Sequence, residues 1–164
     1  MNRLYTFDAT PFPGLRTLYL DDNRLHTLEN CQKLTRLENF SARDQEGEGI
    51  AIEMAEFINS RKLYLSGNPI HELYHLEFKM EFYRLEYLEI CAGCLTMLPD
   101  DFAARFPNLR GLNLSYNEQL DNISALVGLR RLRRLILVRN DIKDSRHVWN
   151  TLEQLPSLVA LDIR

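Results

Sequence analysis

Leucine and other large apolar residues recur along the chain in a fixed phrase, separated by polar residues. The phrase is Leu-x-x-Leu-x-Leu-x-x-Asn-x-Leu, and residues 15–25 (LRTLYLDDNRL) carry it without a departure. Copies of it begin at residues 15, 37, 60, 85, 109, 132 and 158, so the spacings are 22, 23, 25, 24, 23 and 26 residues. Seven phased copies in 164 residues predict an array of short, similar structural units.

Each unit predicts a short strand, a sharp turn and a return segment. The alternation in Leu-x-Leu directs leucines such as Leu18 and Leu20 inward and the x residues to the open face. The Asn that follows, such as Asn23, can bind backbone groups that no regular ladder satisfies. Phrase and period are those of leucine-rich repeat proteins. The predicted fold is therefore an α/β leucine-rich repeat solenoid, curved and right-handed, with a parallel sheet of about seven short strands on its concave face.

The return segments differ from one repeat to the next. In the first and fifth repeats the apolar residues lie near every third position, as in Leu25, Leu28 and Cys31. Residues 100–107 and 141–156 have apolar residues at helical spacing before a Pro, which predicts helical returns. Residues 50–57 are less regular, and residues 71–85 predict another helical return. The residues expected inward in these segments are Ile50, Met54, Phe57, Leu73, Leu76, Met80, Phe82, Phe102, Phe106, Val148, Leu152 and Leu155.

Composition fits one intracellular globular domain over residues 1–164. Hydrophobic residues make up 45% of the chain, charged residues 26%, and the formal net charge is −3. No apolar run is long enough for a membrane span, and no signal peptide precedes the first repeat. Three cysteines without a disulfide-rich cap argue against secretion, so the sequons at Asn39, Asn113 and Asn122 carry low weight. Residues 130–164 hold eight Lys or Arg against four Asp or Glu, too few to predict nucleic-acid binding; the run RRLRR (residues 130–134) fits a solvated edge.

No pattern of catalytic residues is found. His26, His71, His75 and His147 are scattered, and the pair His71 and His75 has no third ligand at a matching spacing. The run CAGC at residues 91–94 favours a turn over a redox or zinc site, and Gly93 stands where Asn is expected. The sequence predicts a protein that is not an enzyme and that holds no metal or cofactor.

Protein binding is the predicted activity, on the concave face formed by the x residues. Tyrosines and arginines are the residue types that most often dominate interfaces, and Ile136 and Val138 are apolar at outward positions. Arg134 and Arg139 favour an acidic or phosphorylated segment of the partner, which we expect toward the C-terminal half. The predicted partner-binding residues are Tyr19, Arg43, Tyr64, Tyr87, Asn113, Tyr116, Arg134, Ile136, Val138 and Arg139.

The ends of the chain predict a fragment of a larger protein. Leu4, Phe7, Phe12 and Leu15 fit the return limb of an earlier coil or a minimal cap. The final LDIR stops two residues short of the Asn that completes a repeat, which predicts an exposed C-terminal edge open to self-association.

Three stretches carry a more specific resemblance: LENFSARDQEG (residues 37–47), RKLYLSGNPI (residues 61–70) and VWNTLEQLPSLVALDIR (residues 148–164). Its distinctive part is residues 40–45, where Gln45 takes the Asn position. The chain resembles the leucine-rich repeat domain of the fungal spindle-pole-body scaffold for mitotic exit and septation signalling, which is related to animal centriolin. The resemblance implies a cytoplasmic scaffold that anchors a small-GTPase regulator and kinase modules at the spindle pole; it carries over no individual binding residue.

Three other classes of repeat protein remain open. A regulatory subunit of protein phosphatase 1 has similar repeats, but those are more uniform than the 22 to 26 residues seen here. An RNA-processing or mRNA-export module is disfavoured by the near-neutral charge. An extracellular receptor fragment requires occupied sequons and caps outside this chain.

Overall fold

The computed structural model describes residues 2–46, 50, 52–68, 70, 81–143 and 145–164. Short parallel strands form a seven-stranded sheet in the order β2-β4-β5-β6-β7-β8-β9, and each begins two residues after the residue that opens its repeat. This confirms the predicted leucine-rich repeat fold and its parallel sheet. The strands are β2 (Thr17–Tyr19), β4 (Asn39–Ser41), β5 (Lys62–Tyr64), β6 (Tyr87–Glu89), β7 (Gly111–Asn113), β8 (Arg134–Ile136) and β9 (Ala160–Asp162).

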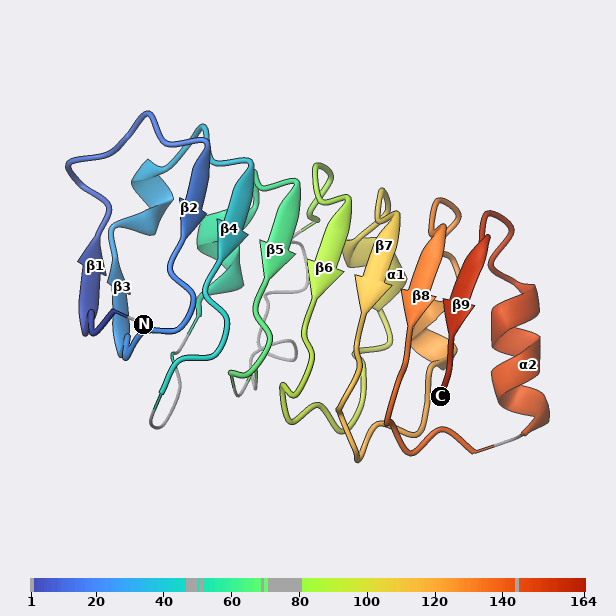
Figure 1. The fold of residues 1–164 in the computed structure, drawn as a ribbon. Helices are drawn as coiled ribbons and strands as arrows, with labels where there is room; N and C mark the ends of the chain where they lie inside the picture. Colours follow the sequence, from blue (N-terminus) through green and yellow to red (C-terminus); the bar gives the residue numbers. More distant parts are fainter. Residues whose placement is uncertain (1, 47–49, 51, 69, 71–80, 144) are drawn as a thin grey trace.

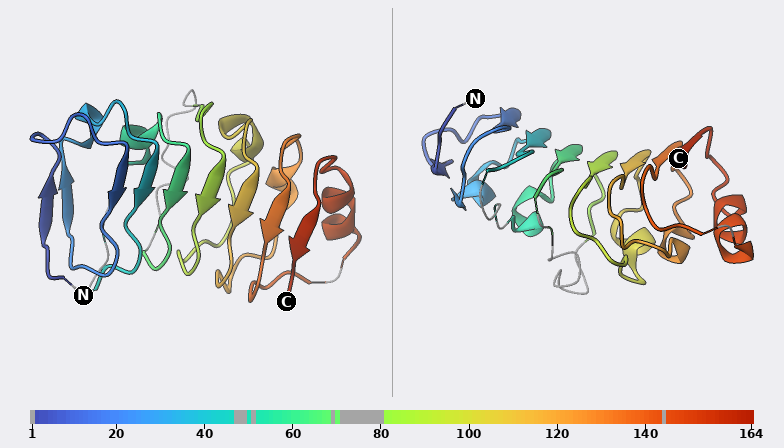
Figure 2. Two further views of the ribbon diagram at one scale, coloured as in Figure 1. Left: turned by 45° about the horizontal axis from the view of Figure 1, so that its top comes forward. Right: turned by 60° about the horizontal axis from the view of Figure 1, so that its bottom comes forward.

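The strands line the inside of a shallow arc, and the return segments form its outside (Figures 1 and 2). Neighbouring strands pair without a slip, so that Leu88 lies beside Leu112 and Leu112 beside Leu135. Identical register keeps the same face of every strand toward solvent. The described return segments contain η1 (Cys31–Lys33), η2 (Met54–Phe57), α1 (Phe102–Arg105), η4 (Ser124–Leu126) and α2 (Arg146–Glu153).

The core lies between the sheet and the return segments. Leu114 and Leu135 are fully buried, and Phe40 of β4 stacks on Phe57 of η2 with ring centroids 4.1 Å apart. Each inward residue of one coil packs against the next coil, as expected where no coil has a core of its own. The inward residues predicted in the return segments are buried wherever they are described; Leu73, Leu76 and Met80 lie outside the described residues.

The predicted helical returns differ in length. Residues 146–153 form the two-turn helix α2, which begins after Ser145, whose Oγ accepts a hydrogen bond from the Val148 N–H at 3.4 Å. Residues 102–105 form only one turn, with Phe102 and Phe106 fully buried. The sixth return therefore supplies the longest described helix on the convex side (Figure 1).

The turns after the strands share one conformation. The residue before the consensus Asn has a positive φ in all six complete repeats: Asp22 (54°), Asp44 (49°), Gly67 (73°), Ala92 (49°), Tyr116 (62°) and Arg139 (55°). An amide that follows such a turn binds backbone groups there, as predicted, and it can also join two coils: Asn68 Nδ2 donates to Leu65 O of its own turn and to Ala42 O of the preceding one. Gln45 has a longer side chain and also donates to a backbone carbonyl of the preceding coil, Leu20 O, at 2.9 Å.

The turn at Gly93 has no amide side chain of its own, as the Gly in place of Asn indicates, yet an amide from the next repeat brackets it. Asn117 of the next repeat accepts from the N–H groups of Gly93 (2.9 Å) and Leu95 (3.1 Å). The same side chain donates to Ile90 O and Leu114 O, each at 2.8 Å. We call the amide side chains that follow the positive-φ residues of these turns the amide ladder; it has no member at position 93, but Asn117 brackets that turn.

The N-terminal segment lies against the first return segment. β1 (Thr6–Asp8) pairs with β3 (Thr27–Glu29) in a separate two-stranded parallel sheet. Phe7 is half-buried and stacks on Phe12. This segment thus lies beside the first return segment, an arrangement that fits either of the two predictions, a return limb of a preceding coil or a minimal cap. At the other end Val159, Leu161 and Ile163 are exposed, and self-association through this edge stays a prediction.

Among the described residues, no helix is both long and apolar enough to cross a membrane.

Candidate functional site: the concave face of the sheet

The outward residues of the strands stand in rows across the concave face because every strand pair has the same register. The first-position row is Thr17, Asn39, Lys62, Tyr87, Gly111, Arg134 and Ala160. The third-position row is Tyr19, Ser41, Tyr64, Glu89, Asn113, Ile136 and Asp162. A turn row continues the face two residues further along each chain segment: Asp21, Arg43, Ser66, Cys91, Ser115, Val138 and Arg164.

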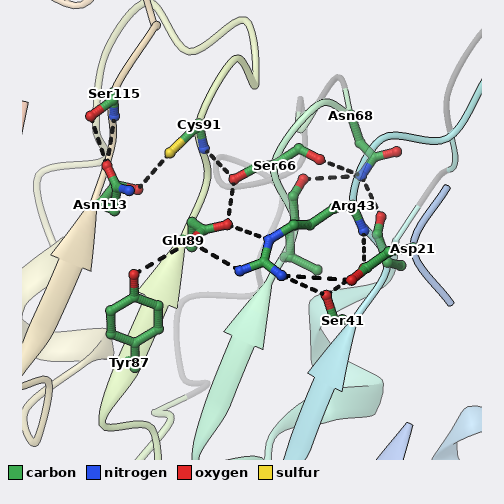
Figure 3. Close-up of polar contacts among 12 residues, drawn as sticks. Asp21, Ser41, Arg43, Ser66, Asn68, Tyr87, Glu89, Cys91, Asn113 and Ser115 are labelled. Atoms are coloured by element: carbon green, nitrogen blue, oxygen red, sulfur yellow. Dashed lines mark hydrogen bonds and ion pairs between the residues drawn. The ribbon is translucent and has the colours of Figure 1, made fainter. Parts of the chain in front are cut away.

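A charged cluster spans the N-terminal half of this face (Figure 3). The Arg43 guanidinium donates to both oxygens of Glu89, through Nε at 2.6 Å and Nη2 at 3.2 Å, although the two residues are 46 positions apart. Its Nη1 lies 3.6 Å from Asp21 Oδ2. Ser41 Oγ donates to Asp21 Oδ1 at 2.5 Å, and Ser66 Oγ donates to Glu89 Oε1 at 2.9 Å. These side-chain contacts join the first four repeats, in addition to the backbone pairing of their strands.

Two tyrosines complete the cluster. The Arg43 guanidinium carbon lies 4.3 Å from the centre of the Tyr64 ring, and the Tyr64 and Tyr87 ring centroids are 5.2 Å apart. The Tyr87 hydroxyl donates to Glu89 Oε2 at 3.3 Å, and burial together with the Glu89 charge raises the pKa of Tyr87 to about 12. Tyr87 therefore stays neutral and keeps its donor at physiological pH.

The protonation of Glu89 follows from its partners. Burial alone would raise the pKa of this carboxyl, but the hydrogen bonds from Arg43 and Ser66 outweigh burial and lower the pKa below its ordinary value. Glu89 is therefore ionised at neutral pH, and Arg43 is already engaged by two carboxylates. The predicted binding residues Arg43, Tyr64 and Tyr87 thus belong to a cluster whose polar groups are already engaged within the chain.

The C-terminal half of the face is less occupied by internal contacts. Arg134 is exposed, and Ile136 and Val138 are half-buried, so each keeps an outward apolar surface. Asn113 Oδ1 accepts from the N–H and Oγ of Ser115, which leaves the Asn113 amide nitrogen without a described acceptor. No carboxylate of the described residues pairs with Arg134 at ion-pair distance, although Asp162 lies in its field.

Tyr19, Tyr116 and Arg139 lie at the margins. Tyr19 is 63% exposed on β2, the edge strand of the sheet, far along the sheet from Tyr116, which is 50% exposed. The Arg139 guanidinium carbon lies 5.8 Å from the Tyr116 ring centre, and both residues sit in left-handed turns. The structure therefore divides the predicted residues into a rigid cluster around Arg43 and a more open group around Ile136.

The sequence prediction omits Asp21, Ser41, Ser66 and Glu89. A usable signal exists, because each of these polar residues occupies the third-position or turn row of its repeat. The sequence does not show which of them pair, since Arg43 reaches past the neighbouring repeat to Glu89. Such a contact depends on side-chain rotamers and not on period.

Redox or metal chemistry has little support on this face. Cys91 and Cys94 are free thiols, and burial raises the pKa of Cys91, which disfavours the reactive thiolate. Within the described part of the chain no group of three His, Cys, Asp or Glu residues is placed to hold a metal ion, while His71 and His75 lie outside it.

The sequence comparisons agree with the repeat fold. The leucine rich repeat family model matches residues 83–142. The chain is 37% identical over 160 residues, 98% of its length, to the septation initiation network scaffold protein cdc11 of Schizosaccharomyces pombe. The chain spans only 15% of the length of that relative. The predicted resemblance to the fungal septation scaffold is confirmed.

Solved structures with the same fold are more distant in sequence. An internalin of Listeria monocytogenes gives a TM-score of 0.60 at 23% identity, covering 96% of this chain and 51% of that one. The TLR13 chain of a complex with ssRNA13 gives a TM-score of 0.73 at 19% identity, covering 99% of this chain and 24% of that one. A leucine-rich repeat protein of Leptospira interrogans gives a TM-score of 0.67 at 22% identity, covering 93% of this chain and 38% of that one. At these identities the likeness establishes the fold alone.

Proposed function

Because the chain has a leucine-rich repeat fold and is similar over 98% of its length to a septation-network scaffold, we propose that residues 1–164 act as one protein-binding scaffold domain. In this proposal the domain anchors regulators of septation and mitotic exit, including a small-GTPase regulator and kinase modules, at the spindle pole. The observation that carries the proposal is the similarity to a protein named as a scaffold. That similarity does not favour a phosphatase regulatory subunit.

We place the partner on the concave face, toward its C-terminal half. Arg134, Ile136 and Val138 combine an exposed cation with adjoining apolar surface, and the Asn113 amide adds a hydrogen-bond donor. Apolar contacts supply affinity, and the arginine favours an acidic or phosphorylated segment. The Arg43 cluster contributes rigidity beside this surface and a smaller share of the binding energy, because its charges are already paired.

Site-specific photo-crosslinking tests this placement. The photoreactive residue p-benzoyl-phenylalanine is introduced at Asn113 on the concave face or, as the matched control, at Gln154, which is exposed just after α2 on the convex side. The protein is tagged at full length and irradiated in mitotic cells. Covalent capture of a septation or mitotic-exit regulator from position 113, and not from position 154, is the expected result. Capture only from position 154 contradicts the placement.

A further inference from the structure

A second row of charges runs along the edge of the sheet where the strands begin. The residue just before each strand is, in order, Arg16, Glu38, Arg61, Glu86, Arg110, Arg133 and Val159. We call this the strand-start row. Its backbone groups are in register: the N–H of each member from Glu38 to Val159 donates to the carbonyl of the member before it, at 2.7 to 2.9 Å. The side chains therefore stand side by side along this edge.

Positive and negative side chains alternate along the strand-start row from Arg16 to Arg110, and the alternation ends at Arg133. Arg16 pairs with Glu38 at 2.7 Å. Glu86 lies between Arg61, 3.9 Å away, and Arg110, 3.5 Å away, so one carboxylate serves two cations at long distances. Arg133 follows Arg110 with no acid between them. Positive charge thus accumulates from β5 to β8, and one glutamate cannot neutralise it.

The loops beside this row add two more cations. Arg84 and Arg131 line a pocket of about 210 Å³ together with Arg61, Glu86 and Arg110, and Tyr83 and Asn108 complete its wall. In the described part of the chain neither Arg84 nor Arg131 has a carboxylate within ion-pair distance. Four guanidinium groups therefore face one carboxylate around a small open cavity.

Hydrogen bonds between neighbouring loops support the pocket. Asn108 Nδ2 donates to Tyr83 O at 2.7 Å, which ties the loop before β7 to the loop before β6. Ser157 Oγ donates to Arg130 O at 2.7 Å and ties down the loop that carries Arg131. The backbone carrying the arginines is thus held before any ligand arrives, which lowers the entropic cost of binding.

Size and charge indicate the ligand. Small-molecule sites usually enclose roughly 300 to 1,000 Å³, so this pocket suits one compact group. Planar guanidinium forks match phosphate oxygens, and a phosphorylated side chain carries a charge of about −1.5 to −2 near neutral pH. Glu86 inside the pocket and Asp100 and Asp101 in the adjoining hollow oppose an extended polyanion such as RNA or an anionic membrane.

We propose that this arginine pocket binds the phosphate of a phosphorylated segment in a partner protein. The inference rests on the proposed scaffold function, and it assigns phosphate recognition to the strand-start edge in addition to the concave face. One partner can then contact both surfaces, with its apolar part near Ile136 and its phosphate in the pocket. Phosphorylation of the partner would control recruitment.

Fluorescence anisotropy tests the proposal with a labelled peptide pool that carries one fixed phosphothreonine between randomised flanks, alongside the same pool without phosphate. The variant is Arg84→Gln with Arg131→Gln. The control, Arg36→Gln with Arg146→Gln, removes the same charge from exposed residues outside the pocket. We expect the phosphorylated pool to bind the control as it binds the unchanged chain, and to bind the pocket variant at least about tenfold more weakly. Lysine at both pocket positions should give an intermediate loss of affinity for the phosphorylated pool, because the positive charge stays but the two-pronged guanidinium donor is removed.

Direct occupancy is measured by titrating inorganic phosphate and following the arginine Nε–H signals by NMR. Shifts that occur in the unchanged chain and disappear in the folded pocket variant support the site. The inference is overturned if both peptide pools bind equally, if the pocket variant binds like the control, or if RNA or phosphoinositide vesicles bind more tightly through the same arginines. Photo-crosslinking from position 113 tests partner binding on the concave face independently of the arginine pocket. Either the concave-face proposal or the phosphate-pocket proposal can therefore fail while the other stands.

Discussion

At the scale of single residues, the turns after the strands are the most constrained positions in the chain. Six equivalent residues adopt positive φ, yet only Gly67 among them is glycine. Other residues in this region cost roughly 1 to 2 kcal/mol each, and Tyr116 and Arg139 are among them. Amide side chains that follow several of these turns, such as Asn68 and Asn117, donate hydrogen bonds to backbone carbonyls and so offset part of this cost. The sequence does not reveal the shared conformation, because no single residue type occupies all six positions.

Gly67 provides a test of this constraint. Gly67→Ala should destabilise the domain by about 1 to 2 kcal/mol, because φ is 73° and a Cβ would lie 2.0 Å from Asp44 Oδ1. Gly14→Ala is the control, since a Cβ there meets nothing within 4 Å. Urea denaturation should show a loss for the first variant and none for the second. Equal midpoints would contradict a strained turn.

Glu89 should make stability depend on pH. Its folded pKa is lowered from an ordinary 4.5, so its contribution is present above that value and is lost as pH falls through and below it. Glu89→Gln should therefore cost about 2 kcal/mol at neutral pH and should flatten the loss of stability on acidification. Denaturant titrations across this acidic range measure both effects. Glu153→Gln on the exposed face of α2 is the control; if it changes the profile as much, the cluster is not the cause.

At the scale of elements, the amide ladder joins the coils. The recurring Asn predicts side-chain bonds to the backbone of each turn, but not that they join neighbouring coils. Gln45 makes such bonds in place of Asn, and Asn117 brackets the turn that has Gly93 instead. At Gly93 the ladder depends on one side chain from the next repeat. That dependence is not visible in the sequence, because it arises only when the two turns are stacked.

Asn117→Ala should be unusually costly for a polar substitution. It removes two donated and two accepted hydrogen bonds with buried backbone groups of two turns, so a loss of about 3 kcal/mol is expected. Asn59→Ala, at an exposed position, should change stability little. Thermal unfolding of the two variants measures the difference. An equally small change in melting temperature for both variants would contradict the prediction and show that water replaces the hydrogen bonds of the lost amide.

The core couples neighbouring coils in the same way. Leu114→Ala or Leu135→Ala should cost about 2 to 5 kcal/mol, since both side chains are fully buried. Because coils contact only their neighbours, amide exchange should rise in the adjoining repeats as well as at the substituted one. An unchanged melting temperature, or faster exchange confined to one repeat, would contradict this coupling.

At the scale of the whole molecule, the sequence predicts the architecture more completely than the surface. Period and alternation fix where each strand begins and which residues are inside, because stacking repeats leaves one arrangement for the leucines. Pairings on the concave face are different: Arg43 joins Glu89 across 46 positions, and no rule of spacing specifies that choice. The arginine pocket likewise combines the strand-start row with loop residues that only the fold brings together.

We propose that the C-terminal half of the concave face recruits the partner. The most direct test compares Arg134→Glu with Ile136→Asp against a convex control, Arg146→Glu with Val127→Asp, which has the same charge change at exposed positions. Folding is followed by circular dichroism and partner recruitment by co-purification with the full-length protein. We expect both variants to fold, the control to recruit the partner normally, and the concave variant to lose at least about tenfold in recruitment. Full recruitment by a folded concave variant would contradict it.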